Sequence, residues 1–227
     1  MFEIVFENAE FVAVDKPSGW LTVPSRFEKE DARKVLGREL ERELNIRLFP
    51  VHRLDFEVSG LVVFAKTAAA HRVAGGWFEK HRIQKTYEGL SRARDFSHWP
   101  ENLKAERDEV PVGIQQKWTS RILRGKRRSY EHPKGDPSST RATLSGQDFA
   151  ERLQWILQPE TGRSHQLRFE MSRHGFPLLG DRLYGSKESW EGPDRIALRA
   201  VSLDLSGIGA DERRGLPESL FVKGLFS

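Results

Sequence analysis

Short runs of apolar residues, separated by turn residues, recur along the chain and predict more strands than helices. Apolar residues alternate or cluster over 2–8 and 10–19, and Pro17 and Gly19 end the second run, which is typical of a strand pair. We expect further strands over 61–66, 83–93, 141–147, 151–159 and 194–207.

Three segments have the end signals of helices. Asp31 is placed to cap a helix over 31–45, whose apolar residues fall on one face. Thr67 is placed to cap a second helix over 68–81, which a pair of glycines weakens. Thr161 is placed to cap a third helix, which Gly175 would end.

The order of these elements indicates the fold class. Strands outnumber helices and do not alternate strictly with them, which favours an α+β fold with a mixed, mostly antiparallel central sheet, flanked by helices and long loops. Residues 95–140 are polar and proline-containing, so we expect long loops there with a strand or two. No repeat or break in composition divides the chain, and we expect one domain over 1–227.

Composition narrows the possible functions. The 227 residues contain no cysteine, which excludes disulfides and thiolate metal sites. Histidine spacing gives no metal motif, and there is no P-loop, GxGxxG or GxSxG, so we expect neither metal nor cofactor. The N-terminus lacks a basic stretch before an apolar run, and no apolar stretch approaches the roughly 18 residues of a membrane span. We therefore expect a cytoplasmic protein without a membrane partner.

The charge is unevenly distributed. The chain carries a net charge of +4, but residues 117–141, including Lys126, Arg127 and Arg128, hold eight basic residues and two acidic ones. Such a patch suits a polyanionic partner, although a solvated loop without a partner explains the charge equally well.

Three stretches contain residues that suit catalysis. In the first, His52, Arg53 and Asp55 precede a predicted buried strand, and a carboxylate beside cations can act as a nucleophile or general base. Taken alone, an Asp55–Arg53 surface salt bridge is the more common arrangement. In the second, Lys85 and Tyr87 lie two apart on a strand and so on one side, where tyrosine can stack on a base. A core tyrosine beside an ordinary lysine explains this pair as well.

The third stretch is the predicted helix after Thr161. Arg163 and His165 would lie in its first turn, where they oppose the helix dipole unless an anion binds there. Arg168 would lie about 140° further round the helix, so one arginine can meet a phosphate while the other turns inward to a buried acid.

The order of the three stretches resembles the RluA-type RNA pseudouridine synthases. "HRLDFEVSGLVVFAK", "KTYEGL" and "TGRSHQLRFEMSRHGFPLLGDRLYG" are similar to three signatures of that family, and the start "FENAEFVAVDKPSGWLTVP" is similar to its opening strand pair. The sequence departs from the family pattern at Val58, Glu170 and Arg199, and the frequent His-Pro after the last strand is missing. We expect no N-terminal S4 domain, because the catalytic pattern begins at residue 3.

The resemblance implies a function and roles for the residues. It implies that uridine in structured rRNA or tRNA is isomerised to pseudouridine without metal or cofactor, with Asp55 as the catalytic carboxylate. Tyr87 would stack on the flipped base, and Arg168 would pair with Asp55. The RNA would be held by the cationic and histidine side chains, namely His52, Arg53, Lys85, Lys126, Arg127, Arg128, Arg163 and His165. We expect a monomer.

Two other functions compete with this one. A catalytically inactive RNA-binding protein on the same fold gives no reason to keep Asp55, Tyr87 and Arg168 together. A hydrolase of glycosidic bonds would use Asp55 and Glu57 as its carboxylate pair, but would not explain the other two stretches.

Overall fold

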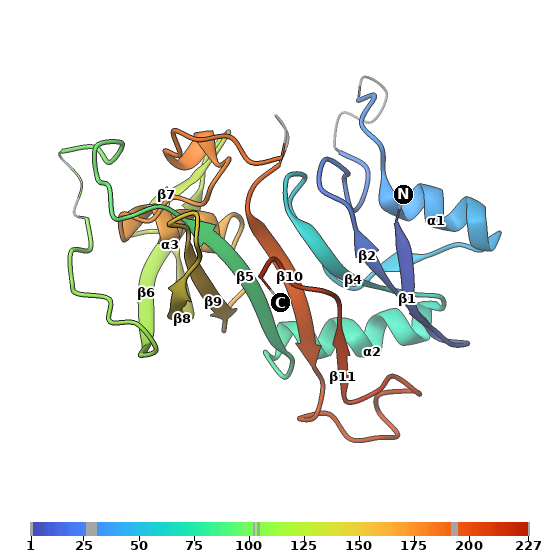
Figure 1. Cartoon of the computed structure of the whole chain (residues 1–227). Helices are drawn as coiled ribbons and strands as arrows, with labels where there is room; N and C mark the ends of the chain where they lie inside the picture. Colours follow the sequence, from blue (N-terminus) through green and yellow to red (C-terminus); the bar gives the residue numbers. More distant parts are fainter. Residues whose placement is uncertain (1, 26–30, 102, 104, 192–194, 227) are drawn as a thin grey trace. The chain divides into compact units, whose positions relative to one another are not determined.

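The computed structural model describes residues 2–25, 31–101, 103, 105–191 and 195–226. Their contacts divide the chain into two compact units, one made of residues 1–85 and 199–223 and the other of residues 86–198 and 224–227 (Figure 1). Each unit has mostly antiparallel strands and few helices, which confirms the predicted α+β class. Within the described ranges, no helix has the length and apolarity that a bilayer crossing requires.

The first unit is built on four strands in the order β1-β2-β4-β10. These are β1 (Glu3–Glu7), β2 (Phe11–Lys16), β4 (Ser59–Ala65) and β10 (Leu198–Asp204). β4 and β10 run parallel, whereas the other neighbours run antiparallel, as the predicted strand pair requires. The short strands β3 (Phe49–Pro50) and β11 (Ser219–Phe221) pair with β4 and β10. They were not predicted, because two or three residues are too short to show a period.

Strand β4 is apolar and buried from Leu61 to Ala65 because both of its faces are covered. Leu61 and Val63 pack in one core with Trp77 of helix α2 (Ala68–Glu79). Phe64 faces the other way, toward Gly37 of helix α1 (Leu36–Leu44). A strand covered on both sides reads as a continuous apolar run rather than an alternating one.

The helix ends differ in how well the sequence predicts them. Thr67 caps α2 as predicted, since its Oγ1 accepts a hydrogen bond from the Ala70 N–H at 3.0 Å. The predicted cap of α1 is wrong. The helix begins at Leu36 after Val35, and the carboxylate of Asp31 instead binds Arg33 through two hydrogen bonds of 2.8 and 2.6 Å.

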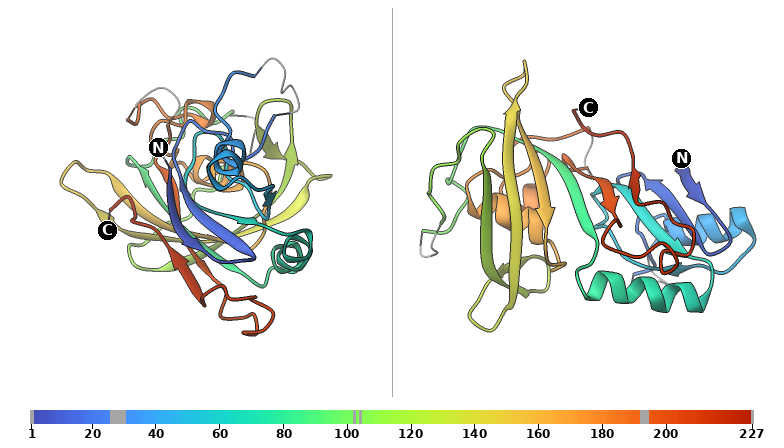
Figure 2. Two further views of the ribbon diagram at one scale, coloured as in Figure 1. Left: turned by 90° about the vertical axis from the view of Figure 1, so that its right-hand side faces the viewer. Right: turned by 90° about the horizontal axis from the view of Figure 1, so that it is seen from below.

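The second unit contains a five-stranded antiparallel sheet in the order β5-β9-β8-β6-β7. The strands are β5 (Gln84–Ser91), which begins in the first unit, β9 (Leu153–Pro159), β8 (Asp136–Gln147), β6 (Gln115–Arg124) and β7 (Ser129–Glu131). The β8–β9 hairpin extends past its neighbours (Figure 2). The expectation of long loops with a strand or two over 95–140 is confirmed for the described residues, since β6 and β7 lie there. The strand predicted over 141–147 is β8, which begins five residues earlier, at Asp136.

One face of this sheet packs against α3 (Gln166–Arg173) and the segment after it. Trp118 of β6 stacks on His174 with ring centroids 3.9 Å apart, and Trp155 of β9 lies 4.8 Å from the Phe176 ring. A short 3₁₀ turn, η2 (Arg182–Tyr184), follows.

Candidate active site

Asp55 lies in a loop between β3 and β4 that is fixed at several points. Thr22 Oγ1 donates to the Leu54 carbonyl at 3.0 Å and accepts from the Leu54 N–H at 3.1 Å. The Val58 N–H donates to the Asp55 carbonyl at 3.2 Å, and the Val58 side chain is buried. The apolar residue that departs from the family pattern therefore serves packing. Asp55 itself is half-buried.

A buried lysine, which the sequence did not predict, supports the same loop. Lys16 is 0% exposed, and its Nζ donates to the carbonyls of Pro17, Trp20 and Phe56 at 3.0, 2.7 and 3.4 Å. Burial lowers the pKa of Lys16 to about 7, while the negative charge of Asp55 is the strongest of three that act in the opposite direction. Lys16 thus joins the β2 end to the residue after Asp55. In the sequence, the Lys-Pro at the end of the second strand marks its position but does not reveal that the side chain is buried.

His52 has a structural role. Its Nε2 accepts a hydrogen bond from the Val63 N–H at 3.1 Å, and its ring stacks on Phe78 at 4.7 Å. Burial lowers the pKa of His52 to about 3, and the nearby charge of Lys85 acts in the same direction. His52 is therefore neutral at pH 7, whereas the role of a cation for phosphate falls more naturally to exposed Arg53.

Tyr87 and Lys85 both lie on β5, as predicted, where Tyr87 is opposite Leu157 of β9. Both side chains are half-buried. Burial lowers the pKa of Lys85 to about 8, so that a sizeable fraction is uncharged slightly above neutral pH.

Arg168 turns inward to a buried acid, and within its own unit that acid is Asp181. Its Nε and Nη2 bind the two carboxylate oxygens at 2.7 and 2.8 Å, and the side chains are 2% and 1% exposed. The guanidinium also lies 5.3 Å from the Tyr184 ring centre. Guanidinium has five N–H donors, so this pair is compatible with the predicted Arg168–Asp55 pair, which joins the two units and stays a prediction. Sequence reasoning gave Asp181 no role, although it lies in the matched "GDRLYG".

The start of α3 differs from the prediction. The helix begins at Gln166 after His165, whose φ is 52°, and Thr161 is not its cap. Thr161 Oγ1 instead accepts from the Ser139 N–H and donates to Gln166 Oε1. Arg163 therefore precedes the helix, and the expected cost of a cation in its first turn does not apply.

His165 belongs to a hydrogen-bonded chain. Its Nε2 lies 3.0 Å from Nη1 of Arg124, and its Nδ1 lies 3.1 Å from the Tyr184 hydroxyl. Because arginine only donates, Nε2 accepts and the ring proton sits on Nδ1. The Tyr184 oxygen also accepts from the Ser129 N–H at 2.7 Å, and burial raises the pKa of Tyr184 to about 12.

The remaining predicted cations are exposed. Lys126, Arg127 and Arg128 form the turn between β6 and β7, closed by a hydrogen bond from the Gly125 N–H to the Arg128 carbonyl at 3.0 Å. Three adjacent cations at an exposed turn suit contact with a polyanion.

Glu170 and Arg199, the two other departures from the family pattern, each bind side chains or carbonyls of their own unit. Glu170 is completely buried, receives a hydrogen bond from Ser120 Oγ and lies 3.6 Å from Arg173, and burial raises the pKa of Glu170. Arg199 pairs with Asp15 and donates to the Lys223 carbonyl at 2.6 Å. No group of three or more histidine, aspartate or glutamate side chains in the described part of the chain is arranged to hold a metal ion.

Comparison with known proteins identifies the family. The model of the RNA pseudouridylate synthase family matches residues 10–173. The dual-specificity RNA pseudouridine synthase RluA of Vibrio vulnificus is 32% identical over 206 residues, which span 88% of this chain and 76% of that protein. RluA of Escherichia coli K12 is 32% identical over 203 residues, spanning 89% and 86%.

A more distant relative and a solved structure are also similar to this chain, the first in sequence and the second in fold. The tRNA pseudouridine synthase C of Pectobacterium carotovorum is 29% identical over 91% of this chain and 56% of that protein. The structure of human RNA pseudouridylate synthase domain containing 1 matches the fold with a TM-score of 0.66 at 23% identity, covering 90% of this chain and 78% of the human chain. The chain therefore belongs to the RluA-type RNA pseudouridine synthases, enzymes that isomerise uridine in RNA.

Proposed function

We propose that this enzyme modifies uridines in a stem-loop of rRNA, tRNA or both, and that Asp55 starts the reaction. The observation that carries the proposal is the fixation of the Asp55 loop by Thr22 on one side and by Lys16 on the other. Such fixation holds a carboxylate in one position, as nucleophilic or base catalysis requires.

The proposed reaction balances without a cofactor. The N1–C1′ bond of uridine breaks, the uracil turns, a C5–C1′ bond forms, and C5 loses the proton while N1 gains one. Asp55 either adds to C1′ or removes the 2′ proton to give a glycal, and both routes end in the same product. Tyr87 would stack on the base and take part in removing the C5 proton.

Arg168 is proposed to orient Asp55. Its pair with Asp181 supports this role, because it fixes one edge of the guanidinium while the remaining N–H donors keep their direction. The target uridine must leave its stack, at a cost of a few kcal/mol that RNA contacts offset. We propose Arg53, Lys85, Arg163, His165 and the 126–128 turn for those contacts, and His52 as a residue that supports them.

The catalytic role of Asp55 is tested by Asp55→Asn, with Glu57→Gln as the matched control in the same loop. Tritium release from [5-³H]uridine-labelled RNA should vanish in the first variant and persist in the second, while RNA binding survives in both. Appreciable release by Asp55→Asn would overturn the assignment. Loss in both variants together would mean that the loop charge matters rather than Asp55.

We also propose that residues 1–227 work as one catalytic domain, as a metal-independent monomer in the cytoplasm. Sedimentation should give the mass of one chain, activity should survive EDTA, and cell fractionation should recover the protein with the cytosol.

A further inference from the structure

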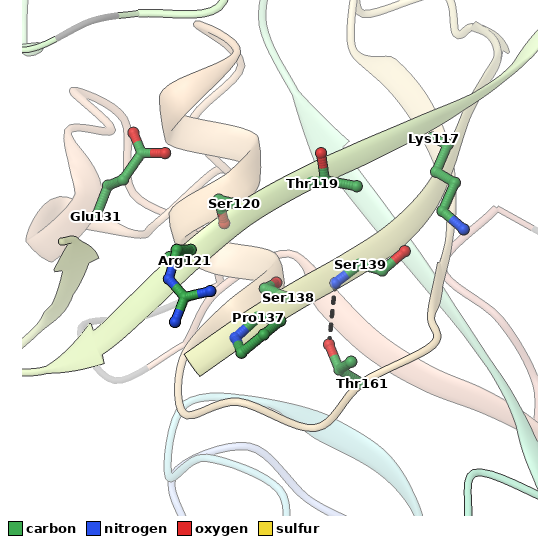
Figure 3. A pocket seen from close by; sticks show the side chains of 9 residues that line it. All are labelled: Lys117, Thr119, Ser120, Arg121, Glu131, Pro137, Ser138, Ser139 and Thr161. Atoms are coloured by element: carbon green, nitrogen blue, oxygen red, sulfur yellow. Dashed lines mark hydrogen bonds between the residues drawn. The ribbon is translucent and has the colours of Figure 1, made fainter. Parts of the chain in front are cut away.

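A pocket of about 490 Å³ lies on the second unit where β6 and β8 run side by side (Figure 3). Its lining includes Lys117, Thr119 and Arg121 from β6, Pro137 and Ser139 from β8, and Thr161. The strand register places Thr119 opposite Ser139 and Arg121 opposite Pro137. Because Trp118 and Ile122 are buried on the opposite face of β6, the side chains of Lys117, Thr119 and Arg121 point away from the core.

On the exposed face of β6 and β8, two cations lie opposite each other and share one carboxylate. Lys117 and Arg141 are directly opposite in the register, and like charges in such positions repel. Glu160 bridges them, at 3.0 Å from Lys117 Nζ and 2.7 Å from Arg141 Nε. Hydrogen bonds from the Ser139 and Lys117 side chains lower the pKa of Glu160 to about 2. One carboxylate thus serves two cations.

Two further cations are held by neutral oxygens. Arg121 Nε donates to the Pro133 carbonyl at 2.9 Å, and Arg163 Nε donates to the Pro137 carbonyl at 3.0 Å. A carbonyl fixes the guanidinium without cancelling its charge. The acid nearest Arg163 is Asp136, which is 72% exposed and 3.8 Å away.

The one carboxylate in the lining, Glu131, pairs elsewhere. It lies 3.2 Å from Nη2 of Arg173, a cation that is only 6% exposed. Arg173 also pairs with Glu106 at 2.8 Å and lies 3.6 Å from Glu170, so it offsets only part of the Glu131 charge. The lining still has two cations, Lys117 and Arg121, against this one partly offset carboxylate, beside several hydroxyl groups.

We propose that this pocket binds a phosphodiester group of the RNA, in addition to the nucleotide that is isomerised. Arginine, lysine, serine and threonine side chains are the groups that contact phosphate oxygens in nucleic-acid complexes. A volume of about 490 Å³ accommodates a phosphate with its flanking sugars. The proposal rests on the proposed function only in taking RNA as the source of the phosphate.

The test compares three single variants in RNA binding at several KCl concentrations, using refolded total tRNA and rRNA from a strain lacking the gene. Arg121→Gln should weaken binding and lower the slope of log Kd against log salt by about 0.7, the value for one lost phosphate contact on a single strand. Thr119→Ala should weaken binding several-fold with an unchanged slope, because a hydroxyl carries no charge. Lys187→Gln is the control, since Lys187 is exposed, pairs with Asp95 at 2.7 Å and does not line the pocket.

Three outcomes would overturn the proposal. A wild-type salt slope in Arg121→Gln would show that the pocket binds no phosphate of the RNA. A fall of the slope in Lys187→Gln equal to that in Arg121→Gln would show that the effect depends on net charge rather than on the pocket. Amide shifts at Thr119 and Ser139 on titration with inorganic phosphate, without any change of RNA slope in Arg121→Gln, would assign the pocket to free phosphate. A failure of the proposed function would be distinguishable from a failure of this proposal, because tritium release tests the first and the salt slope tests the second.

Discussion

Lys16 in the first unit and Arg168 in the second are both almost completely buried, yet they are neutralised in different ways. Arg168 lies beside a buried carboxylate, with two hydrogen bonds to Asp181. Lys16 is surrounded by three carbonyl oxygens, and its acids, Asp55 foremost, act through space. Burial consequently lowers the pKa of Lys16 to about 7.

The difference shows what each cation contributes. A buried ion pair is destabilising to break, because the remaining charge has no counter-ion. A buried lysine with a lowered pKa makes its charged form unfavourable in the folded state. The Arg168–Asp181 pair therefore contributes to the stability of its unit. The charge of Lys16 instead lowers the stability of the folded state, which is the cost expected of a residue that positions the Asp55 loop.

The largest expected effect is on the buried pair. Asp181→Asn keeps the shape of the side chain but removes the buried negative charge that Nε and Nη2 of Arg168 bind, and should lower the free energy of unfolding by about 3 kcal/mol. Urea denaturation followed by tryptophan fluorescence measures this change. Glu191→Gln breaks the exposed pair with Arg195 and should change stability little. Equal changes in the two variants would refute a special role for burial.

Lys16→Met should affect activity much more than stability. It removes the unfavourable buried charge but leaves the Pro17 and Trp20 carbonyls without their donor, so the two effects offset within about 1 kcal/mol at pH 6. Phe56 loses its link to β2, and pseudouridine formation should fall at least about tenfold, which corresponds to 1.4 kcal/mol. Full activity in Lys16→Met would contradict a positioning role.

The pH dependence gives that variant a second readout. The pKa of Lys16 is lower in the folded chain, about 7 against 10.5, so its penalty is complete below pH 7 and disappears as pH rises from 7 to 10.5. Over that range the free energy of unfolding of the wild type should therefore rise relative to that of Lys16→Met, by at most about 1.4 kcal/mol for each pH unit. The lowered pKa of Lys85, about 8, acts in both proteins and cancels in the difference.

The features of the fold that depend only on residues close together in the sequence are the ones that the sequence predicts correctly. The strand pair at the N-terminus and the Thr67 cap of α2 follow from short-range patterns. The caps proposed at Asp31 and Thr161 are wrong, because those side chains bind other partners. Asp31 binds the nearby Arg33, and Thr161 binds Ser139 of β8.

The site shows the same limit. The catalytic role of Asp55 and its pairing with Arg168 come from the family resemblance, since a charged residue in a sequence does not reveal its partner. Lys16 becomes recognisable only when carbonyls from positions 17, 20 and 56 converge on it, and Asp181 only when it meets Arg168. The basic stretch 117–141 contained a readable signal, since Trp118 and Ile122 alternate with polar residues as in a half-buried strand.

The smallest expected effect tests the contrast between the cations directly. Lys16 should titrate near pH 7 in a ¹³Cε NMR experiment, whereas arginine stays charged throughout that range. The negative charge of Glu57 raises the pKa of Lys16, so Glu57→Gln should move the midpoint down by roughly 0.3 to 0.5. Glu3→Gln, an exposed change on β1, should leave it unmoved. A midpoint near 10 in the wild type would mean that water reaches Lys16, and the distinction between the two cations would then be one of partners rather than of solvation.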